Sequence, residues 1–291
     1  MAVTTDAGIP VAVATAPQGL RHDLRAVKVV WQRELIRFSS DRTRIFTALL
    51  QPVLFLFVLG TGLSSLTAGA SAGTGISLKT FLFPGVLGMS VLFTAMFSAA
   101  SIVWDREFGF LREMLVAPIS RGSIVVGKCF GGATVATLQG LLILALAGFV
   151  GVPYNVELFA TLICEMALLS FTLTALGVVI AARLQSIQAF MAVNQMIVMP
   201  MFFLSGALFP LGNLPVWLAF LTRLDPLTYA ISPMKHAVFD HLDVPPEVAA
   251  RFNPGLTWFG WPVPVALQIG IVLALGLVLL AVGIFEFRKA D

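Results

Sequence analysis

Six long apolar runs limit what this chain can fold into. They lie at residues 45–63, 81–103, 124–150, 158–182, 189–209 and 265–287. About 20 apolar residues in a helix cross the roughly 30 Å hydrocarbon core of a bilayer, and a helix satisfies its own backbone hydrogen bonds there. Only 11% of the residues are charged, against about 25% in soluble domains. The runs therefore predict an all-α integral membrane protein with six transmembrane helices, in a transmembrane domain over residues 45–288.

The connection between the fifth and sixth runs, residues 210–264, is apolar but interrupted by nine prolines. Two stretches in it, residues 216–224 and 227–239, are too short to cross a bilayer. Asn213 and Asp225 precede them and are typical helix-capping residues. We expect two re-entrant half-helices on the extracellular side.

The N-terminal region divides into two parts. Residues 1–19 have no helical period and predict a disordered cytoplasmic tail. Residues 20–44 form an amphipathic pattern, and we expect an interfacial helix in the headgroup layer. A helix packed against a soluble partner is an alternative that is compatible with it. The predicted apolar face is Leu20, Leu24, Val27, Trp31, Leu35 and Phe38. The residues expected to act at the interface are Arg21, Arg25, Lys28, Trp31, Arg33 and Glu34.

Lysine and arginine positions predict the orientation. Fourteen of them fall before the first span, in the second-to-third and fourth-to-fifth loops and in the C-terminal tail, and four fall on the other side. Positive residues concentrate on cytoplasmic loops. Both termini are therefore expected in the cytoplasm, and nothing in this distribution indicates a nucleic-acid partner.

Residues 104–121, WDREFGFLREMLVAPISR, form a charged island between the second and third spans. As one helix ended by Pro118, the segment would place Trp104, Phe108, Leu111 and Leu115 on a single apolar stripe. Its charged residues are Asp105, Arg106, Glu107, Arg112 and Glu113. The orientation places this short amphipathic helix on the cytoplasmic surface of the bundle.

Residues 122–129, GSIVVGKC, nearly match a phosphate-binding loop but lack its final Ser or Thr, and no strand precedes them. Gly127 and Gly131 are instead spaced for close helix packing. The three histidines lack metal-binding spacing, and no hydrolase or metalloprotease motif occurs. We expect no catalytic, cofactor or metal site on this chain, so it is not predicted to be an enzyme.

Several residues inside the spans could line a substrate path. Glu165 lies in mid-span, where a carboxylate costs roughly 3 kcal/mol, so it faces protein or a cavity, or is protonated. It could serve as a substrate-cavity or proton-relay residue, or form a buried hydrogen bond to Gln139, Asn194, Gln195 or a Thr. Either role is compatible with the sequence. Aromatic residues and Met in the second and fifth spans could form an adaptable apolar cavity. The candidate path is Phe93, Met96, Phe97, Glu165, Asn194, Gln195, Met199 and Phe202.

Three segments together resemble one family, and one of them is the amphipathic N-terminal segment, residues 20–44. Residues 81–140, which include the charged island, and residues 199–239, MPMFFLSGALFPLGNLPVWLAFLTRLDPLTYAISPMKHAVF, resemble ABC-2 type transporter permeases, particularly the daunorubicin-resistance-like branch of drug and lipid exporters. The resemblance covers about residues 20–288. It implies six spans, with the two half-helices after the fifth.

The resemblance also implies partners. A second permease subunit, identical or different, and two separate ABC ATPase subunits would complete the transporter, and ATP and Mg²⁺ would bind to the ATPases. The N-terminal helix and the charged island would dock on them. The coupling residues would be Trp104, Asp105, Arg106, Glu107, Phe108, Leu111, Arg112, Glu113 and Leu115.

The expected function is therefore export of small amphipathic drugs, antibiotics or lipids across a bacterial cytoplasmic membrane. A polysaccharide-exporting ABC permease has the same architecture. An ion-coupled secondary transporter would need intramembrane charge pairs and internal repeats, and only Glu165 fits that pattern. A membrane enzyme or a scaffold would need a catalytic cluster or large soluble loops.

Overall fold

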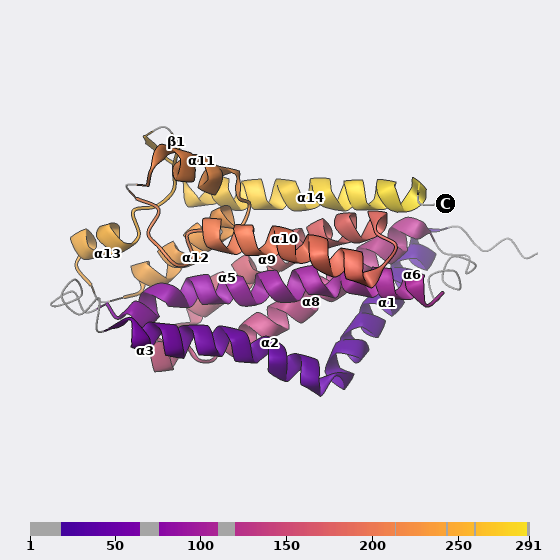
Figure 1. The fold of residues 1–291 in the computed structure, drawn as a ribbon, viewed down its shortest axis with the longest axis horizontal. Helices are drawn as coiled ribbons and strands as arrows, with labels where there is room; N and C mark the ends of the chain where they lie inside the picture. The colour runs from indigo at the N-terminus through magenta and orange to yellow at the C-terminus, as the bar shows by residue number, and fades with distance from the viewer. Residues whose placement is uncertain are drawn as a thin grey trace, which may run out of the picture.

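A computed structural model describes residues 19–64, 76–109, 120–212, 214–242, 244–258 and 260–289 (Figure 1). The predicted N-terminal tail therefore lies outside the described residues except for Gly19. In chain order the first elements are α1 (Leu20–Ser40), α2 (Arg42–Leu54), a π-helical turn (Phe55–Leu59), α3 (Gly60–Gly62), α5 (Leu78–Ser98), α6 (Ala100–Glu107) and α8 (Arg121–Leu144). The others are a 3₁₀ turn (Ala147–Val150), α9 (Val156–Arg183), α10 (Ile187–Leu204), α11 (Val216–Leu224), α12 (Thr228–Asp240), α13 (Pro246–Phe252), β1 (Thr257–Trp258), β2 (Trp261–Pro262) and α14 (Val265–Lys289).

The predicted all-α fold with six membrane-spanning helices is confirmed. Among the described residues, six helical stretches are long and apolar enough to cross a bilayer: Ile45–Gly62, Leu78–Glu107, Arg121–Leu144, Val156–Arg183, Ile187–Leu204 and Val265–Phe287. The first stretch carries Pro52 and then widens into the π-helical turn, as helices do where the regular bonding pattern is interrupted.

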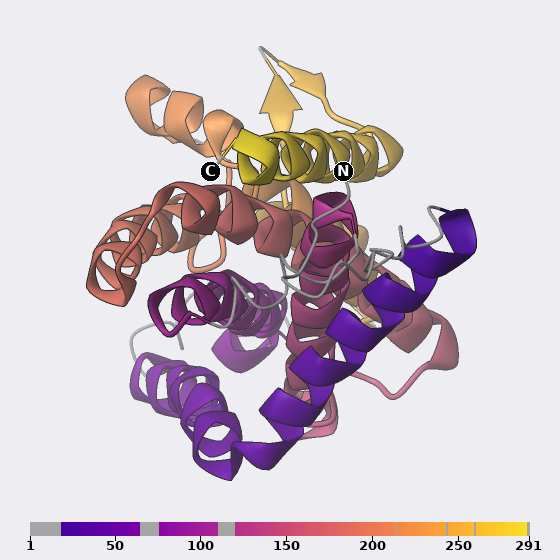
Figure 2. The ribbon, with the colours of Figure 1, turned by 90° about the vertical axis from the view of Figure 1, so that its right-hand side faces the viewer.

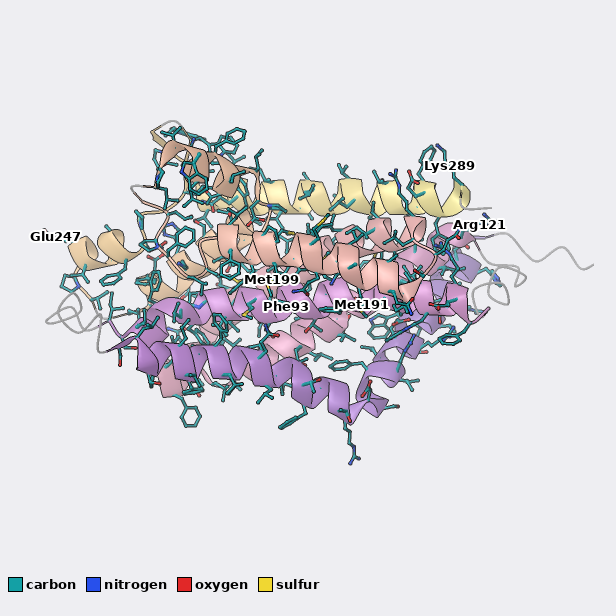
Figure 3. All side chains as sticks on the ribbon, in the orientation of Figure 1. Phe93, Arg121, Met191, Met199, Glu247 and Lys289 are labelled. Atoms are coloured by element: carbon teal, nitrogen blue, oxygen red, sulfur yellow. The ribbon has the colours of Figure 1, made fainter. Side chains whose placement is uncertain are left out.

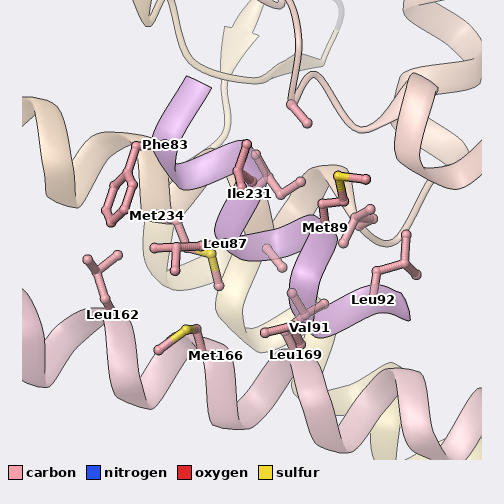
Figure 4. Packing of buried hydrophobic residues seen from close by; sticks show 14 of the residues in the cluster. Phe83, Leu87, Met89, Val91, Leu92, Leu162, Met166, Leu169, Ile231 and Met234 are labelled. Atoms are coloured by element: carbon pink, nitrogen blue, oxygen red, sulfur yellow. The ribbon is translucent and has the colours of Figure 1, made fainter. Parts of the chain in front are cut away.

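The second span lies at the centre of the bundle. In its most apolar stretch 89% of the residues are buried, against 17% in the first and in the sixth span. Side chains of α5 pack against α9 and against the short helix α12 (Figure 4). The residues in this core include Phe83, Leu87, Val91, Leu162, Met166, Leu169, Ile231 and Met234. The half-helix α12 is thus part of the core.

The bundle has two different ends (Figure 1). We call the end with α1, α6, the start of α8 and the end of α14 the basic end, and the end with the 210–264 connection the proline-rich end. Arg121 and Lys289 lie at the former and Glu247 at the latter (Figure 3). Which end faces the cytoplasm remains a prediction from the basic residues.

The proline-rich end holds both predicted short helices, α11 and α12. Asp225 accepts a hydrogen bond from the backbone N–H of Leu227 at 3.1 Å, but it is not the N-cap of α12 as expected, because that position is Leu227, which makes no side-chain cap bond. Asn213 lies outside the described residues. Helix α13 and the hairpin β1–β2, in which Trp258 pairs with Trp261, were not predicted from the sequence.

The predicted helix over residues 20–44 is wrong at its C-terminal end. Helix α1 ends at Ser40, Asp41 leaves the helical conformation, and α2 starts at Arg42 and continues into the first span at Ile45. The predicted apolar face is also rotated, because Leu24 is 59% exposed. The buried face consists of Ala26, Val30, Glu34 and Phe38.

Candidate coupling site

The charged island begins as the end of the second span. Helix α6 continues α5 and ends at Glu107, and Gly109 has a φ of +82° that glycine adopts without strain. A single helical stripe from Trp104 through Phe108 to the leucines is therefore wrong, since the helix stops between them. Of the predicted coupling residues, Leu111, Arg112, Glu113 and Leu115 lie outside the described residues.

Asp105 is the first of three consecutive charged residues and belongs to a buried ionic cluster. Its Oδ2 accepts from the Lys128 Nζ at 2.6 Å, and its Oδ1 pairs with Arg33 at 3.3 Å. The same lysine donates to the Glu34 carboxylate at 2.6 Å and to the Ser101 hydroxyl at 3.0 Å. The Lys128 side chain is only 3% exposed. This cluster joins α1, α6 and α8, and its two carboxylates compensate the buried ammonium group.

Arg106 holds the end of the fourth span. Its guanidinium donates to the carbonyl oxygens of Ala181 at 3.2 Å, Ala182 at 3.1 Å and Leu184 at 2.6 Å. These carbonyls close helix α9, where the last turn has no partners inside the helix. A cation is also favoured there by the helix dipole.

Glu107 reaches the start of the fifth span. Its Oε2 accepts from the backbone N–H of Ile187 at 3.1 Å, at the first residue of α10. A carboxylate at a helix N-terminus is favoured by the dipole. Ser186 caps the same helix through Ala189. Three consecutive residues, Asp105, Arg106 and Glu107, therefore connect the second span to α1, α8, α9 and α10.

These bonds were not predicted from the sequence. Asp105, Arg106 and Glu107 were expected to face an ATPase, and the structure shows each of them bonded inside the chain. Their contact with a partner stays a prediction. Phe108, by contrast, is 71% exposed, so its side chain is available to contact a partner protein. Trp104 lies under the Arg37 guanidinium, 4.8 Å from the ring centroid.

Helix α1 crosses the bundle over α8 (Figure 2). Close packing at Gly127 and Gly131 is confirmed, because a Cβ at either position would come within 2.7 Å of the Val30 or Glu34 side chain. The partner at these glycines is α1, which the sequence did not indicate. Trp31 donates its indole N–H to the Thr134 hydroxyl at 3.0 Å. Of the other predicted interfacial residues, Arg21, Arg25 and Lys28 are exposed.

The predicted substrate-path residues do not form one site. Phe93 and Phe97 line a cavity of about 280 Å³ between α1, α2, α5, α6 and α10, together with Met191. Phe93 and Met191 are labelled in Figure 3. The remaining lining residues are Phe38, Thr47, Ala48, Gln51, Pro52, Thr94, Ala100 and Trp104.

The other predicted path residues lie away from that cavity lining. Met96, Asn194 and Phe202 are buried, whereas Gln195 and Met199 are exposed. Glu165 is buried on α9. In the part of the chain that the structure describes, its Oε2 and the side-chain amides of Gln139 and Asn194 have no hydrogen-bond partner. The bonds from Glu165 to Gln139 or Asn194 that the sequence allowed are therefore not formed.

The match to known proteins starts inside α1 and ends at the last turn of α12. The family model of the ABC-2 type transporter matches residues 25–239. This chain belongs to the ABC-2 type transporter family. The match therefore includes most of α1, the residues Asp105, Arg106 and Glu107, and the short helices α11 and α12.

Of three curated relatives of this ABC-2 permease, two are named as transport permeases. It is 31% identical over 222 residues to nodulation protein J of Rhizobium leguminosarum bv. viciae, covering 75% of this chain and 83% of the relative. It is 30% identical over 211 residues to the putative transport permease ycf38 of Cyanophora paradoxa, covering 71% and 72%. It is 26% identical over 223 residues to the inner membrane transport permease YadH of Escherichia coli K12, covering 76% and 85%. The chain is thus the membrane component of an ABC-2 transporter.

Proposed function

We propose that this chain is the permease subunit of an ABC exporter that moves amphipathic drugs, antibiotics or lipids out of the cytoplasm or the inner leaflet. Separate ATPase subunits would supply the energy. Family membership supports the transport role. The observation that carries the export mechanism is the bonding of Asp105, Arg106 and Glu107 to four other helices at the basic end.

In this proposal the ATPase subunits bind to the segment that follows α6 and displace it. We infer that two ATPase subunits contact this segment and α1, and that the basic end faces the cytoplasm. A displacement of α6 reaches α8 and α1 through Asp105, the end of α9 through Arg106 and the start of α10 through Glu107. Packed helices move as rigid bodies between discrete arrangements, so these helices shift together.

The cavity beside Phe93 and Phe97 is the proposed substrate path. Its lining is mainly apolar, with Thr47 and Gln51 as polar groups on α2. Apolar pockets with a few polar groups suit amphipathic molecules. Residues of α6 and α10 line this cavity. A displacement of these helices at the basic end therefore changes the width of the cavity. This supports the drug- and lipid-exporting branch of the family and a role in efflux.

A second permease subunit, identical or different, would complete the path. The first and fifth spans, like the sixth, bury few of their residues within the subunit, with 17% and 28% of the most apolar stretches of the first and fifth buried. We place the second subunit against these two spans. ATP and Mg²⁺ would bind to the ATPase subunits.

Arg106→Ala tests the coupling. The permease is co-purified with its ATPase, reconstituted in liposomes and assayed for ATP hydrolysis with a panel of drugs and lipids. We expect Arg106→Ala to keep the ATPase bound but to lower substrate-stimulated hydrolysis about fivefold, which corresponds to about 1 kcal/mol of coupling.

The matched control is Arg183→Ala, which removes an exposed pair with Glu286 at the same end of the bundle. Exposed ion pairs contribute little, so this variant should keep its stimulation. Equal stimulation in Arg106→Ala and the wild type would refute the coupling role. Failure to co-purify any ATPase would refute the proposed function itself.

A further inference from the structure

A groove of about 330 Å³ lies between α1 and α8, separate from the cavity proposed for substrate. Its lining residues are Leu24, Val27, Lys28, Trp31, Phe130 and Thr134. Four come from the amphipathic helix and two from the third span. The groove therefore lies where the basic helix crosses a membrane-spanning helix.

The lining is apolar apart from one cation at its edge. Leu24 and Phe130 are large apolar residues left 59% and 48% exposed. The polar groups of Trp31 and Thr134 are bonded to each other at 3.0 Å, so these two residues offer mainly carbon atoms. Lys28 is exposed, and among the described residues no carboxylate forms an ion pair with it. The groove thus combines an apolar floor with an uncompensated ammonium group.

The groove also lies at a depth that lipid occupies. Phe130 is nine residues from the first residue of α8, or about 14 Å along the helix axis at 1.5 Å per residue. Helix α8 is one of the six candidate spans. An acyl chain can therefore reach Phe130 from the surrounding bilayer, while a headgroup stays near Lys28 and Arg25 at the surface.

We propose that this groove binds one anionic phospholipid, with an acyl chain against Leu24, Trp31 and Phe130 and its phosphate at Lys28. Lysine side chains near a membrane surface attract anionic headgroups, and apolar surface binds the chain. Such a lipid is a structural ligand that holds α1 against α8. The proposal does not depend on which molecules the permease exports.

The test uses the purified full chain in nanodiscs of phosphatidylcholine with or without phosphatidylglycerol. We expect native mass spectrometry to show one retained phosphatidylglycerol per chain, and thermal unfolding to occur at a higher temperature when this lipid is present. Lys28→Glu should weaken lipid retention at least about fivefold. Leu24→Trp, which fills the groove without changing the charge, should weaken it too.

The matched control is Lys289→Glu, which makes the same charge change at the basic end but outside the groove. It should leave the retained lipid in place. Equal losses in Lys28→Glu and Lys289→Glu would mean diffuse attraction to the whole surface and would overturn the proposal. Stabilisation by inorganic phosphate alone, or no retained lipid in the wild type, would overturn it as well.

Discussion

Two buried lysines, one at each end of the bundle, are held in different ways. Lys128 at the basic end donates to the carboxylates of Glu34 and Asp105, both at 2.6 Å. Lys235 at the proline-rich end donates to the carbonyl oxygen of Gly206 at 2.6 Å and lies 4.1 Å from the ring centroid of Phe81. Among the described residues, no carboxylate bonds to Lys235. One ammonium group is compensated by charge and the other only by dipoles and an aromatic face.

This difference gives the two ends different chemistry. Burial lowers the pKa of Lys235 to about 7, because a charged amine is disfavoured away from water. Its bonds tie α12 to the loop that follows α10, at Gly206 and Phe209. Paired charges around Lys128 therefore hold the helices together at the basic end. At the proline-rich end, the strength of the Lys235 contacts with Gly206 and Phe209 depends on whether the Lys235 amine is protonated.

The largest expected effect is at the basic end. Lys128→Met leaves the Glu34 and Asp105 carboxylates buried without their shared cation. Removing one partner of a buried ionic group costs about 3–5 kcal/mol. We expect a loss of this size in the free energy of unfolding, measured by chemical denaturation in detergent.

The control for this prediction is the triple variant Lys128→Met, Glu34→Gln and Asp105→Asn. It removes the charges together, so most of the lost stability should return. A loss below about 1 kcal/mol in the single variant would contradict the view that charge compensation fixes the basic end.

The membrane-spanning helices could be predicted because each needs only a long apolar run, which is a local property of the sequence. The buried face of α1 could not. Glu34 lies on that face, and a carboxylate there looks like a surface residue until its partner Lys128, 94 positions away, is placed beside it. The glycine pair on α8 was readable as a packing site, but the identity of its partner helix depends on the tertiary fold.

The charged island was predicted as one continuous helix, which is wrong, whereas its role in coupling stays a prediction. The apolar spacing of Trp104 and Phe108 fits a continuing helix, and only the positive φ of Gly109 shows where it ends. Composition also could not tell which face of α5 or α10 borders a cavity. Phe93 and Met96 are three residues apart, yet Phe93 lines the cavity and Met96 lies in the core.

The second prediction concerns the proline-rich end. Since the pKa of Lys235 is about 7 in the folded chain and near 10.4 when unfolded, the unfolded chain binds more protons between these values. Stability should therefore fall as the pH drops from about 10 to 7, by about 4 kcal/mol, and level off below. Lys235→Met should abolish this dependence in unfolding experiments run across that pH range.

Lys79→Met is the control at the same end. Lys79 is only partly buried, and its Nζ lies 5.7 Å from the Phe57 ring centroid. This variant should keep the wild-type pH dependence. An unchanged pH profile of stability in Lys235→Met would contradict the proposed difference between Lys128 and Lys235.

The smallest effect comes from two matched tryptophans. Trp31 donates to Thr134 at the basic end and Trp258 donates to Tyr229 at the proline-rich end, both at 3.0 Å. Replacing either by Phe removes one partly buried hydrogen bond, and each should cost about 1 kcal/mol of unfolding free energy. Only Trp31→Phe loosens the contact between α1 and α8, so it alone should lower substrate-stimulated ATP hydrolysis in the reconstituted complex. Equal effects of both variants on hydrolysis would mean that the basic end has no special part in coupling.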